Sequence, residues 1–212
     1  MRKIVLASVS NILMVILPLL GAPQLILHPK ILLLIAGSVA IWLTQPAFTV
    51  QETSEQKQSD RFSVWLILCM SLVSVVAPIV HWAYFLEEKD RYDWAFFLGV
   101  AMIAGGIGFR AMAVRYLGKY FTATVQIRED HHLITSGPYR IVRHPSYTGA
   151  FLAIVAGGVV LGSLPGFVIS CMAMMLAYYV RIGIEEKELT ERFGDEYRSY
   201  QQRTKMIVPY VW

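Results

Sequence analysis

The sequence predicts an all-α, polytopic integral membrane protein with four spanning helices, a short C-terminal helical hairpin and a cytosolic amphipathic helical tail. The first observation behind this prediction is composition: of the 212 residues, 56% are hydrophobic and only 16% are charged. Soluble domains are typically about 25% charged. The second observation is distribution, because the hydrophobic residues form long runs that are nearly free of charge, as the interior of a bilayer requires.

Four apolar runs fill the N-terminal half, and each is predicted to cross the membrane. A hydrocarbon core of about 30 Å needs roughly 20 apolar residues in a helix. Pro46 is expected to kink or end the second run, because proline lacks the backbone N–H. The basic start could imitate a secretory signal, but Gly21-Ala22-Pro23 is a poor cleavage site and more apolar runs follow. The four runs are Ile4–Leu20, Ile31–Val50, Phe62–Leu86 and Trp94–Leu117.

A membrane hairpin is predicted for residues 147–180, with arms at Tyr147–Leu161 and Gly166–Val180. Each arm has about 15 residues, or roughly 22 Å of helix. This length is short for a crossing, so we expect a hairpin that returns to the side from which it entered, with a tilted spanning pair as the alternative. The charged segment Arg181–Arg203 has apolar residues at helical spacing. It is therefore predicted to be an amphipathic helix or helix pair, interrupted at Gly194.

The charges predict an orientation. The loop between the third and fourth runs, residues 87–93, is net negative, whereas basic residues gather at and after the end of the fourth run. The positive-inside rule then places the N-terminus and the whole C-terminal third in the cytoplasm. The basic residues are Arg110, Arg115, Lys119, Arg128, Arg140 and Arg143.

Most side chains capable of chemistry lie in two polar segments, residues 118–149 and 181–203, which flank the predicted hairpin. Folding the hairpin brings both of its ends to one face of the membrane. We therefore expect one site built from the two segments, although neither segment alone identifies its chemistry.

Arg143 and His144 are the first candidates within these segments. Pro145 lacks an N–H and biases His144 toward an extended conformation, after which Ser146 can cap a helix. The two side chains would then lie near a helix N-terminus, which suits an anionic group. The alternative is an interfacial arginine with its charge in water and an ordinary hydrogen-bonded histidine.

Arg181 and Glu185 are the second pair of candidates. They are separated by four residues, so they share one face of a helix. They also directly follow an apolar arm, where ionisable side chains are usually functional. The alternative is an ordinary salt bridge on an interfacial helix.

Several patterns are missing from the sequence. There is no G-x-G-x-x-G after a strand, no P-loop and no HExxH. The glycines at residues 105–108 and 158–162 are expected to allow close helix packing. Cys69 and Cys171 lie in apolar runs and suggest buried side chains, not a zinc site. No basic patch with interleaved aromatic residues indicates nucleic-acid binding, and no metal is expected.

The polar segments contain five motifs that resemble the isoprenylcysteine carboxyl methyltransferase family over roughly residues 116–203. The short chain is similar to the prokaryotic type of that family, which is related to phospholipid methyltransferases. The RHPxYxG element by itself is shared with those enzymes and with some sterol reductases. The motifs are Val125-Gln126, His131–Tyr139 (HHLITSGPY), Arg143–Gly149 (RHPSYTG), Arg181 with Glu185-Glu186, and Phe193–Tyr197 (FGDEY).

The resemblance implies an S-adenosylmethionine-dependent methyltransferase with a cofactor site unlike the Rossmann fold. It divides the chain into a transmembrane helical bundle, residues 1–117, and a cofactor-binding catalytic region, residues 118–212. It implies that Arg143, Arg181 and Glu185 lie at or near the reacting end. The cofactor-binding residues that it implies are Gln126, His131, Leu133, Tyr139, His144, Pro145, Tyr147, Gly149 and Glu186.

The acceptor stays open at this point. It could be an isoprenylcysteine carboxylate, a small lipophilic acid or thiol, or a phospholipid amine, in each case reached from the surrounding membrane lipids. A carboxylate would need no general base, whereas an amine or thiol would need one, for which Glu185 or His144 could serve. The competing functions are an NADPH-dependent membrane reductase of the sterol type and a non-catalytic membrane protein.

Overall fold

The computed structural model describes residues 9, 13–45, 58–122 and 132–207. Within these residues the helices are joined by loops and turns, and the structure contains one isolated parallel bridge, between Val142 and Lys205, and no strand. The all-α prediction is therefore confirmed. The α-helices are α2 (Pro29–Leu43), α4 (Gln58–Phe85), α5 (Trp94–Leu117), α6 (Pro145–Val160), α7 (Leu164–Phe193) and α8 (Asp195–Arg203), with 3₁₀ turns at Leu17–Leu19, Pro23–Leu25, Gly118–Tyr120 and Gly137–Arg140.

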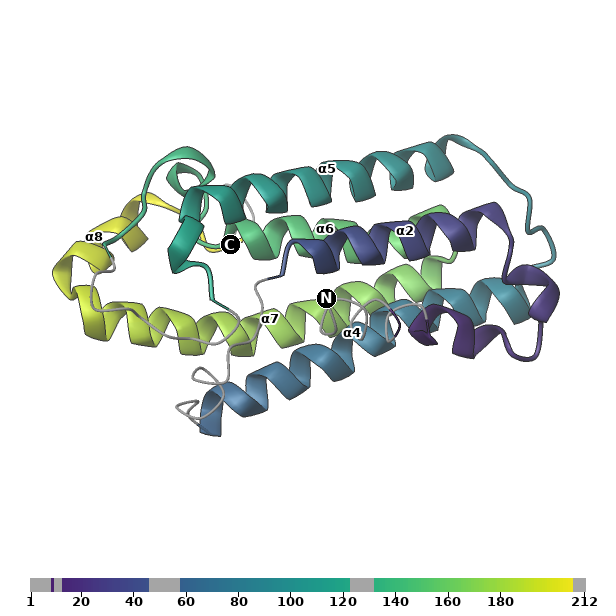
Figure 1. The fold of residues 1–212 in the computed structure, drawn as a ribbon, viewed down its shortest axis with the longest axis horizontal. Coiled ribbons are helices and arrows are strands. Elements are labelled where there is room, and N and C mark those ends of the chain that lie inside the picture. Colours follow the sequence, from purple (N-terminus) through teal and green to yellow (C-terminus); the bar gives the residue numbers. More distant parts are fainter. Residues whose placement is uncertain (1–8, 10–12, 46–57, 123–131, 208–212) are drawn as a thin grey trace.

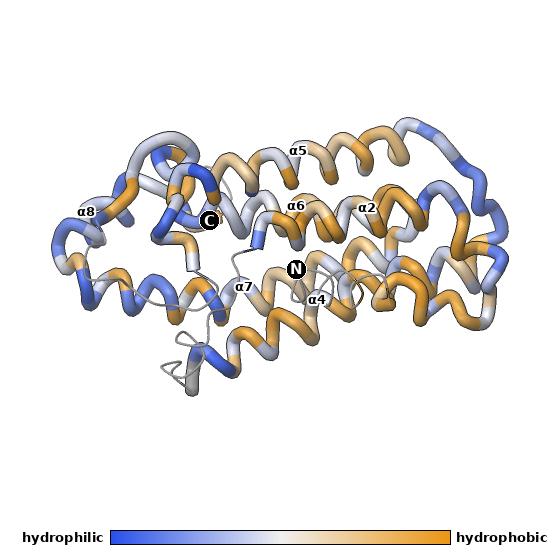
Figure 2. The backbone as a smooth tube through the Cα atoms, in the orientation of Figure 1, coloured by the Kyte–Doolittle hydropathy of each residue, from blue (hydrophilic) through white to orange (hydrophobic). Residues whose placement is uncertain are grey.

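The long helices form an elongated bundle in which α5 packs most extensively on α6 and α4 on α7, while α2 contacts both α5 and α6 (Figure 1). Hydrophobic residues occupy the middle of this bundle and hydrophilic residues gather at its two ends (Figure 2). This distribution is the one that a membrane imposes, because the apolar middle lies in hydrocarbon and the polar ends meet water.

Three helices among the described residues are long and apolar enough to cross a membrane: Asp60–Phe85, Trp94–Tyr120 and Leu164–Phe193. The prediction of four spans before the polar segment is not reproduced. The second expected span is the 15-residue α2, which is too short to be counted with them, and residues 4–8 and 10–12 of the first lie outside the described residues. The fourth predicted span, by contrast, has the same bounds as α5.

The predicted hairpin is corrected in one respect, because its arms are unequal. The first arm is the 16-residue α6, but the second continues through Val180 and Arg181 as part of the 30-residue α7. At 1.5 Å per residue α7 is about 45 Å long. The charge of Arg181 does not end the helix, since a buried carboxylate compensates it, and Gly183 stays helical, so α7 continues to Phe193 before Gly194.

Residues at the helix ends account for these boundaries. The Asp93 carboxylate accepts hydrogen bonds from the backbone N–H groups of Ala95 (3.1 Å) and Phe96 (3.2 Å) and so caps α5. At the end of α7, Gly194 adopts φ 55°, which lies in the left-handed region that favours glycine. The predicted interruption at Gly194 is therefore confirmed, and α8 starts directly after it.

Two glycines bring α5 and α6 into close contact. A Cβ atom on Gly106 would lie 2.6 Å from the carbonyl oxygen of Gly149, and one on Gly149 would lie 2.5 Å from the carbonyl oxygen of Gly106. Only glycine fits at this distance, so the expected role in close packing is confirmed for Gly106. Gly105 and Gly108 have open space around them and face outward instead. The Gly106–Gly149 contact fixes the first turns of α6 against the last turns of α5.

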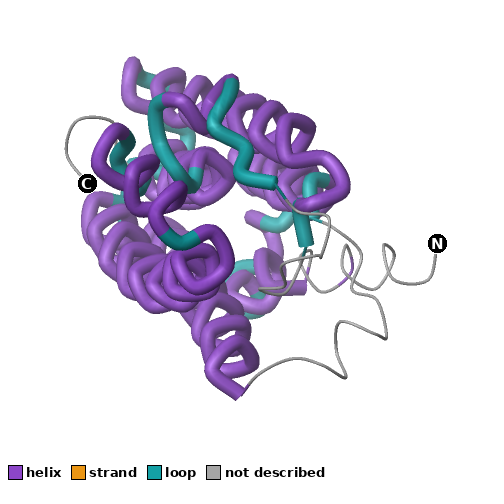
Figure 3. The backbone as a smooth tube through the Cα atoms, turned by 90° about the vertical axis from the view of Figure 1, so that its left-hand side faces the viewer, coloured by secondary structure: helices purple, strands orange, loops and turns teal. Residues whose placement is uncertain are grey.

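The C-terminal ends of α5 and α7 and the N-terminal end of α6 lie at one end of the bundle (Figure 1). Figure 3 looks at this end and shows loop segments and α8 in front of the helices. The two polar segments that flank the hairpin therefore meet, as the sequence predicts. The candidate site lies here.

Candidate functional site

A pocket of about 820 Å³, including its open mouth, lies at this end of the bundle. Its walls come from the end of α5, the α5–α6 connection, the start of α6, the last turns of α7, and α8. The lining residues are Leu117, Tyr120, Phe121, Thr122, Leu133, Ile134, Tyr139, Arg143, His144, Ser146, Tyr147, Arg181, Glu185, Leu189, Tyr197 and Tyr200.

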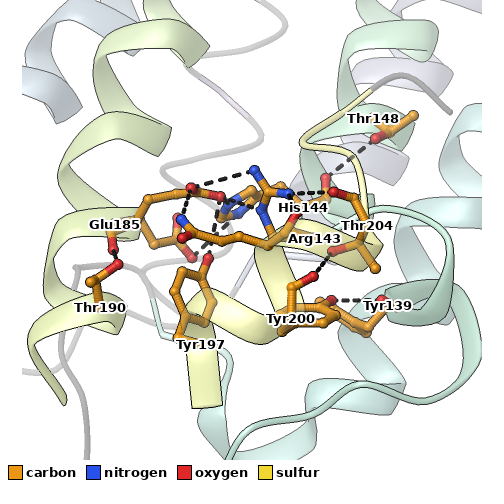
Figure 4. Close-up of polar contacts among 11 residues, drawn as sticks. Tyr139, Arg143, His144, Thr148, Glu185, Thr190, Tyr197, Tyr200 and Thr204 are labelled. Carbon is orange, nitrogen blue, oxygen red and sulfur yellow. Dashed lines mark hydrogen bonds and ion pairs between the residues drawn. The ribbon is translucent and has the colours of Figure 1, made fainter. Parts of the chain in front are cut away.

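Glu186 on α7 connects the elements around the pocket. Its Oε1 atom accepts from Arg143 Nε (2.6 Å), and the Tyr197 hydroxyl donates to the same atom over 3.2 Å. His144 Nε2 lies 3.0 Å from Oε1, and Gln201 Nε2 donates to Oε2 over 2.7 Å. An ionised carboxylate only accepts hydrogen bonds, so Nε2 of His144 carries the proton. Figure 4 shows Arg143, His144 and Tyr197 converging on this point.

The segment after α8 holds the backbone of Arg143 and His144. The backbone N–H of Arg143 donates to Lys205 O (2.8 Å), and that of His144 donates to Met206 O (3.0 Å). The Arg143 guanidinium also donates to the carbonyl oxygen of Thr204 (2.5 Å). Arg143 thus joins Glu186 to the C-terminal segment, and much of its hydrogen-bonding capacity is used within the protein.

Three buried tyrosines stiffen the same region. Burial raises the pKa of Tyr139, Tyr197 and Tyr200 above that of an exposed phenol, so their hydroxyls stay protonated and donate hydrogen bonds. Tyr200 donates to the carbonyl oxygen of Tyr139 over 2.6 Å, and both side chains are drawn in Figure 4. The nearby Glu186 also raises the pKa of Tyr197. These bonds tie α8 to the 3₁₀ turn before α6.

Arg181 lines the pocket from α7 and is only 4% exposed. Its Nε donates to the hydroxyl of Tyr147 over 3.2 Å, while its Nη1 forms a close ion pair with Asp60. The same Nη1 donates to the Ser63 hydroxyl over 2.9 Å. Arg181 therefore reaches from the pocket to the first turns of α4.

Glu185 faces the pocket next to these groups. Its side chain is 30% exposed, and its Oε1 lies 3.9 Å from Nδ1 of His144. Tyr147 lines the same pocket as Glu185. The Glu186 carboxylate is bonded to other side chains of the protein. Of the two neighbouring glutamates, Glu185 is therefore the one whose carboxylate can contact a ligand.

Arg110 lies directly behind the pocket wall. It is buried on α5, where its Nη1 donates to the carbonyl oxygen of Ser146 (2.9 Å) and its Nε to the hydroxyl of Thr44 (2.7 Å). Its guanidinium also lies 5.6 Å from the centre of the Phe121 ring. Ser146 and Phe121 both line the pocket, so Arg110 adds positive charge beside it.

The residues predicted from the sequence divide into three groups. Those that line the pocket are Leu133, Tyr139, Arg143, His144, Tyr147, Arg181 and Glu185. Glu186, Pro145 and Gly149 are not in the lining: Glu186 lies behind His144, Pro145 starts α6, and Gly149 packs on α5. Gln126 and His131 lie outside the described residues.

Sequence reasoning missed several pocket residues. Tyr120, Phe121 and Ile134 lie at or after the end of α5, where the sequence offers only scattered aromatic and apolar residues. Tyr197 and Tyr200 are predicted as part of an apolar helix face, and that periodicity was the available signal for them. Asp60 and Arg110 could be found only by noting single charged residues at the edges of apolar runs.

Among the described residues, no group of three or more histidine, cysteine, aspartate or glutamate side chains is arranged to hold a metal ion. The polar groups around the pocket are instead arginines, carboxylates and phenols that bond to one another.

Comparison with known proteins identifies related chains. The model of the isoprenylcysteine carboxyl methyltransferase (ICMT) family matches residues 98–191. The chain is 34% identical over 148 residues to protein-S-isoprenylcysteine O-methyltransferase B of Arabidopsis thaliana, covering 69% of this chain and 73% of the relative. It is 29% identical over 153 residues to the rat (Rattus norvegicus) protein-S-isoprenylcysteine O-methyltransferase, covering 68% of this chain and 54% of that protein.

A solved structure of the eukaryotic intramembrane Ras methyltransferase ICMT is also similar. It superposes with a TM-score of 0.64 at 26% sequence identity, and the match covers 94% of this chain and 73% of the solved one. The likeness thus extends over the N-terminal helices as well as the motif-bearing region.

The apolar helices, the polar pocket at one end of the bundle and these relatives define an integral membrane methyltransferase. The chain belongs to the isoprenylcysteine carboxyl methyltransferase family. The competing functions, a sterol-type reductase and a non-catalytic membrane protein, are not favoured.

Proposed function

We propose that the pocket binds S-adenosylmethionine and that the protein methylates the carboxylate of a lipophilic acceptor of the isoprenylcysteine class. The observation that carries this proposal is the position of Glu185, in a pocket walled by aromatic side chains with Arg181 and Arg110 beside it. The names of the relatives supply the acceptor class. An isoprenylcysteine carboxylate is therefore favoured over a thiol or a phospholipid amine.

The lining of the pocket suits the chemical groups of S-adenosylmethionine. Aromatic side chains suit its adenine and, through cation–π attraction, its sulfonium. Glu185 suits its ammonium group, and the first turn of α6 next to His144 suits its carboxylate. The aromatic lining residues are Tyr120, Phe121, Tyr139, Tyr147, Tyr197 and Tyr200.

We accordingly propose as cofactor contacts the pocket residues Leu133, Tyr139, His144 and Tyr147. The same role is proposed, from the sequence, for Gln126 and His131. Glu186, Pro145 and Gly149 are proposed to support the pocket from behind. This proposal refines the predicted boundary between the transmembrane bundle, residues 1–117, and the cofactor-binding region, residues 118–212. The second region supplies most of the pocket walls, and α4 and α5 of the first supply charged side chains behind these walls.

When bound, S-adenosylmethionine supplies an electrophilic methyl group. An acceptor carboxylate is already ionised at neutral pH, so the protein has no need of a general base. Arg181 can fix such a carboxylate through its planar guanidinium, and the buried Arg110 favours an anion in the same space. The aromatic walls exclude water. The work of the protein is then alignment and desolvation.

A second cavity offers space for the lipophilic part of the acceptor. It has a volume of about 460 Å³ and is lined almost entirely by apolar residues of α2, α4, α5 and α6. Ile154 lines this cavity and Tyr147 lines the first pocket. Seven residues of α6 separate them, so they lie on one helix face about 10 Å apart. We propose that an isoprenoid chain extends from the pocket along α6 into this cavity.

We also propose that the pocket end of the bundle faces the cytoplasm, as the basic residues around it predict. The exposed Arg115, Lys119 and Arg140 lie at this end, whereas Glu87, Glu88 and Asp90 lie in the loop between α4 and α5. The crossing of the membrane by the first predicted span, Ile4–Leu20, belongs to the same proposal.

The test is methyl transfer from radiolabelled S-adenosylmethionine to N-acetyl-S-farnesylcysteine by detergent-purified protein, with the carboxamide of the acceptor as the control. We expect ester formation with the acid and none with the amide. Glu185→Gln should lower kcat/KM by roughly 100-fold or more, because a charged ligand contact is lost. Glu191→Gln, on an exposed part of the same helix, is the matched control.

Calorimetry on the same samples separates binding from chemistry. A folded protein that binds NADPH and ignores S-adenosylmethionine would overturn the proposal. Equal activity in the Glu185→Gln and Glu191→Gln variants would remove Glu185 from the site.

A further inference from the structure

We propose that Asp60, in the N-terminal part of the bundle, is a positioning residue for methyl transfer that acts through Arg181. Asp60 lies on the first turn of α4, outside residues 98–191 that match the family model. The inference rests on the proposed function, because it assigns Arg181 to the reacting end of the pocket.

Asp60 and Arg181 form an ion pair that is almost completely removed from water. Asp60 is 3% exposed and Arg181 is 4% exposed. Ser63, which is fully buried, donates to the backbone carbonyl of Asp60 (2.8 Å) and accepts from Arg181 Nη1 (2.9 Å). The three residues therefore form one buried polar cluster between α4 and α7.

Other contacts also hold α4 against α7. Farther along the two helices, Ser170 donates to the carbonyl oxygen of Ser74 over 2.7 Å, and Ile79 and Met174 are buried among apolar neighbours. Burying an ion pair costs much of what its attraction returns, and well-packed apolar replacements are often as stable or more so. Stability alone therefore does not account for a carboxylate at this position.

The geometry of Arg181 supplies a reason. Its guanidinium is planar and rigid, so fixing one edge fixes the other. The Nη1 edge is held by Asp60 and Ser63, whereas the Nε edge donates to the Tyr147 hydroxyl inside the pocket. Asp60 thereby sets the plane in which Arg181 faces the acceptor.

The chain of contacts continues beyond Arg181. The Tyr147 hydroxyl accepts from Arg181, and Tyr147 lines the pocket together with Glu185. Asp60 is thus connected through Arg181 to a side chain of the pocket wall. Asp60 also balances the positive charge of the buried Arg181.

The experiment compares Asp60→Asn, Asp60→Glu and Ser63→Ala with the wild-type enzyme, using kcat, the acceptor KM and the cofactor Kd. We expect Asp60→Asn to lower kcat about 10-fold or more, because the guanidinium loses its fixed plane. Asp60→Glu keeps the charge but shifts it, so its kcat should be intermediate. Ser63→Ala should lose about threefold or less. The cofactor Kd should change by no more than about threefold, since the aromatic walls are untouched.

A double-mutant cycle tests whether Asp60 acts through Arg181. In an Arg181→Lys background, Asp60→Asn should change kcat by less than about twofold, because the group through which it acts is already altered. Multiplicative effects of the two substitutions would overturn the proposal, as would wild-type kcat in Asp60→Asn. If Asp60→Asn is not monodisperse in detergent, the Asp60→Glu variant decides, and wild-type kcat there overturns the proposal.

Failure of the proposed role of Asp60 can be distinguished from failure of the proposed function. A wild-type protein that neither binds S-adenosylmethionine nor methylates the acceptor would refute that function. An active wild type with equally active Asp60 variants would refute only the role of Asp60.

Discussion

The two ends of the helix bundle contain similar charged side chains but use them differently. At the pocket end, Arg143 and Glu186 form an ion pair with side chains only 10% and 12% exposed, and further residues bond to both. At the opposite end, His28 pairs with Asp90, whose side chain is 81% exposed. The first pair belongs to a connected network, whereas the second joins a helix start to a loop.

Lys89 shows the same contrast at the opposite end. Its ammonium donates to the carbonyl oxygens of Trp82 (2.6 Å) and Leu86, near the end of α4. Cations stabilise the C-terminal end of a helix in this way. Charges at this end therefore terminate and anchor helices, and charges at the pocket end hold one another in place around a ligand site. Substitutions at the two ends should differ accordingly.

Among substitutions outside the pocket lining, the largest effect is expected from Glu186→Gln. The variant keeps the shape of the side chain but leaves Arg143 without its buried counter-charge and weakens the contact with His144. We expect kcat/KM to fall by roughly 100-fold, since misplacement of pocket groups by about 1 Å has that effect. Methyl transfer measured beside the Glu191→Gln control checks this. Wild-type kinetics in Glu186→Gln would show that the network does not position the site.

The next effect comes from the close contact that joins the pocket end to the middle of the bundle. In Gly149→Val, the new Cβ would lie 2.5 Å from Gly106 O and 2.6 Å from Arg110 N, so α5 and α6 must separate. We expect a loss of about 1–3 kcal/mol in stability together with reduced activity. Thermal unfolding in detergent measures the first. Gly108→Val is the control, because the structure leaves open space there.

A selective effect is expected from filling the second cavity. Gly157 lines this cavity, and a Cβ there would make only an ordinary 3.6 Å contact with Leu34. Gly157→Val should therefore fold normally and raise KM for a farnesylated acceptor by about 10-fold. A shorter prenyl chain should be affected less. Equal KM changes for both chain lengths would exclude the cavity as the site of the isoprenoid chain.

The smallest effect belongs to the opposite end and depends on pH. Hydrogen bonds from the backbone of Phe96 and Ala95 and the nearby Arg91 hold the pKa of Asp93 below its ordinary value of 3.8. The folded state therefore gains stability that is present above pH 3.8 and is lost as the pH falls through the lower folded value. Asp93→Asn keeps a good helix cap but removes this pH dependence. Unfolding curves between neutral and acidic pH measure it, and unchanged methylation at neutral pH is expected.

Much of the fold was predictable because hydrophobic runs and helix-breaking residues are local signals. The run Trp94–Leu117 coincides with α5, and Gly194 marks the end of α7. The length of α7 was not predictable from a charge boundary at Arg181, because the carboxylate that neutralises it comes from Asp60, far away in the sequence. Local patterns contain no information on such long-range pairs.

The site was predictable to a similar degree. The motifs led to Arg143, His144, Arg181 and Glu185, which the structure brings together at one pocket. The sequence could not separate Glu185 from Glu186, since neighbouring residues on a helix differ by about 100° in direction and only the packing decides which one faces the ligand.

The segment Thr204–Ile207 has a consequence for the biosynthesis of this protein. It holds the backbone of Arg143 and His144, and Thr148 on α6 donates to Ile207 O over 2.7 Å. The ribosome makes this segment after every other described element of the pocket. The membrane helices can therefore insert while the site is still incomplete, and methyl transfer can begin only once translation has passed residue 207.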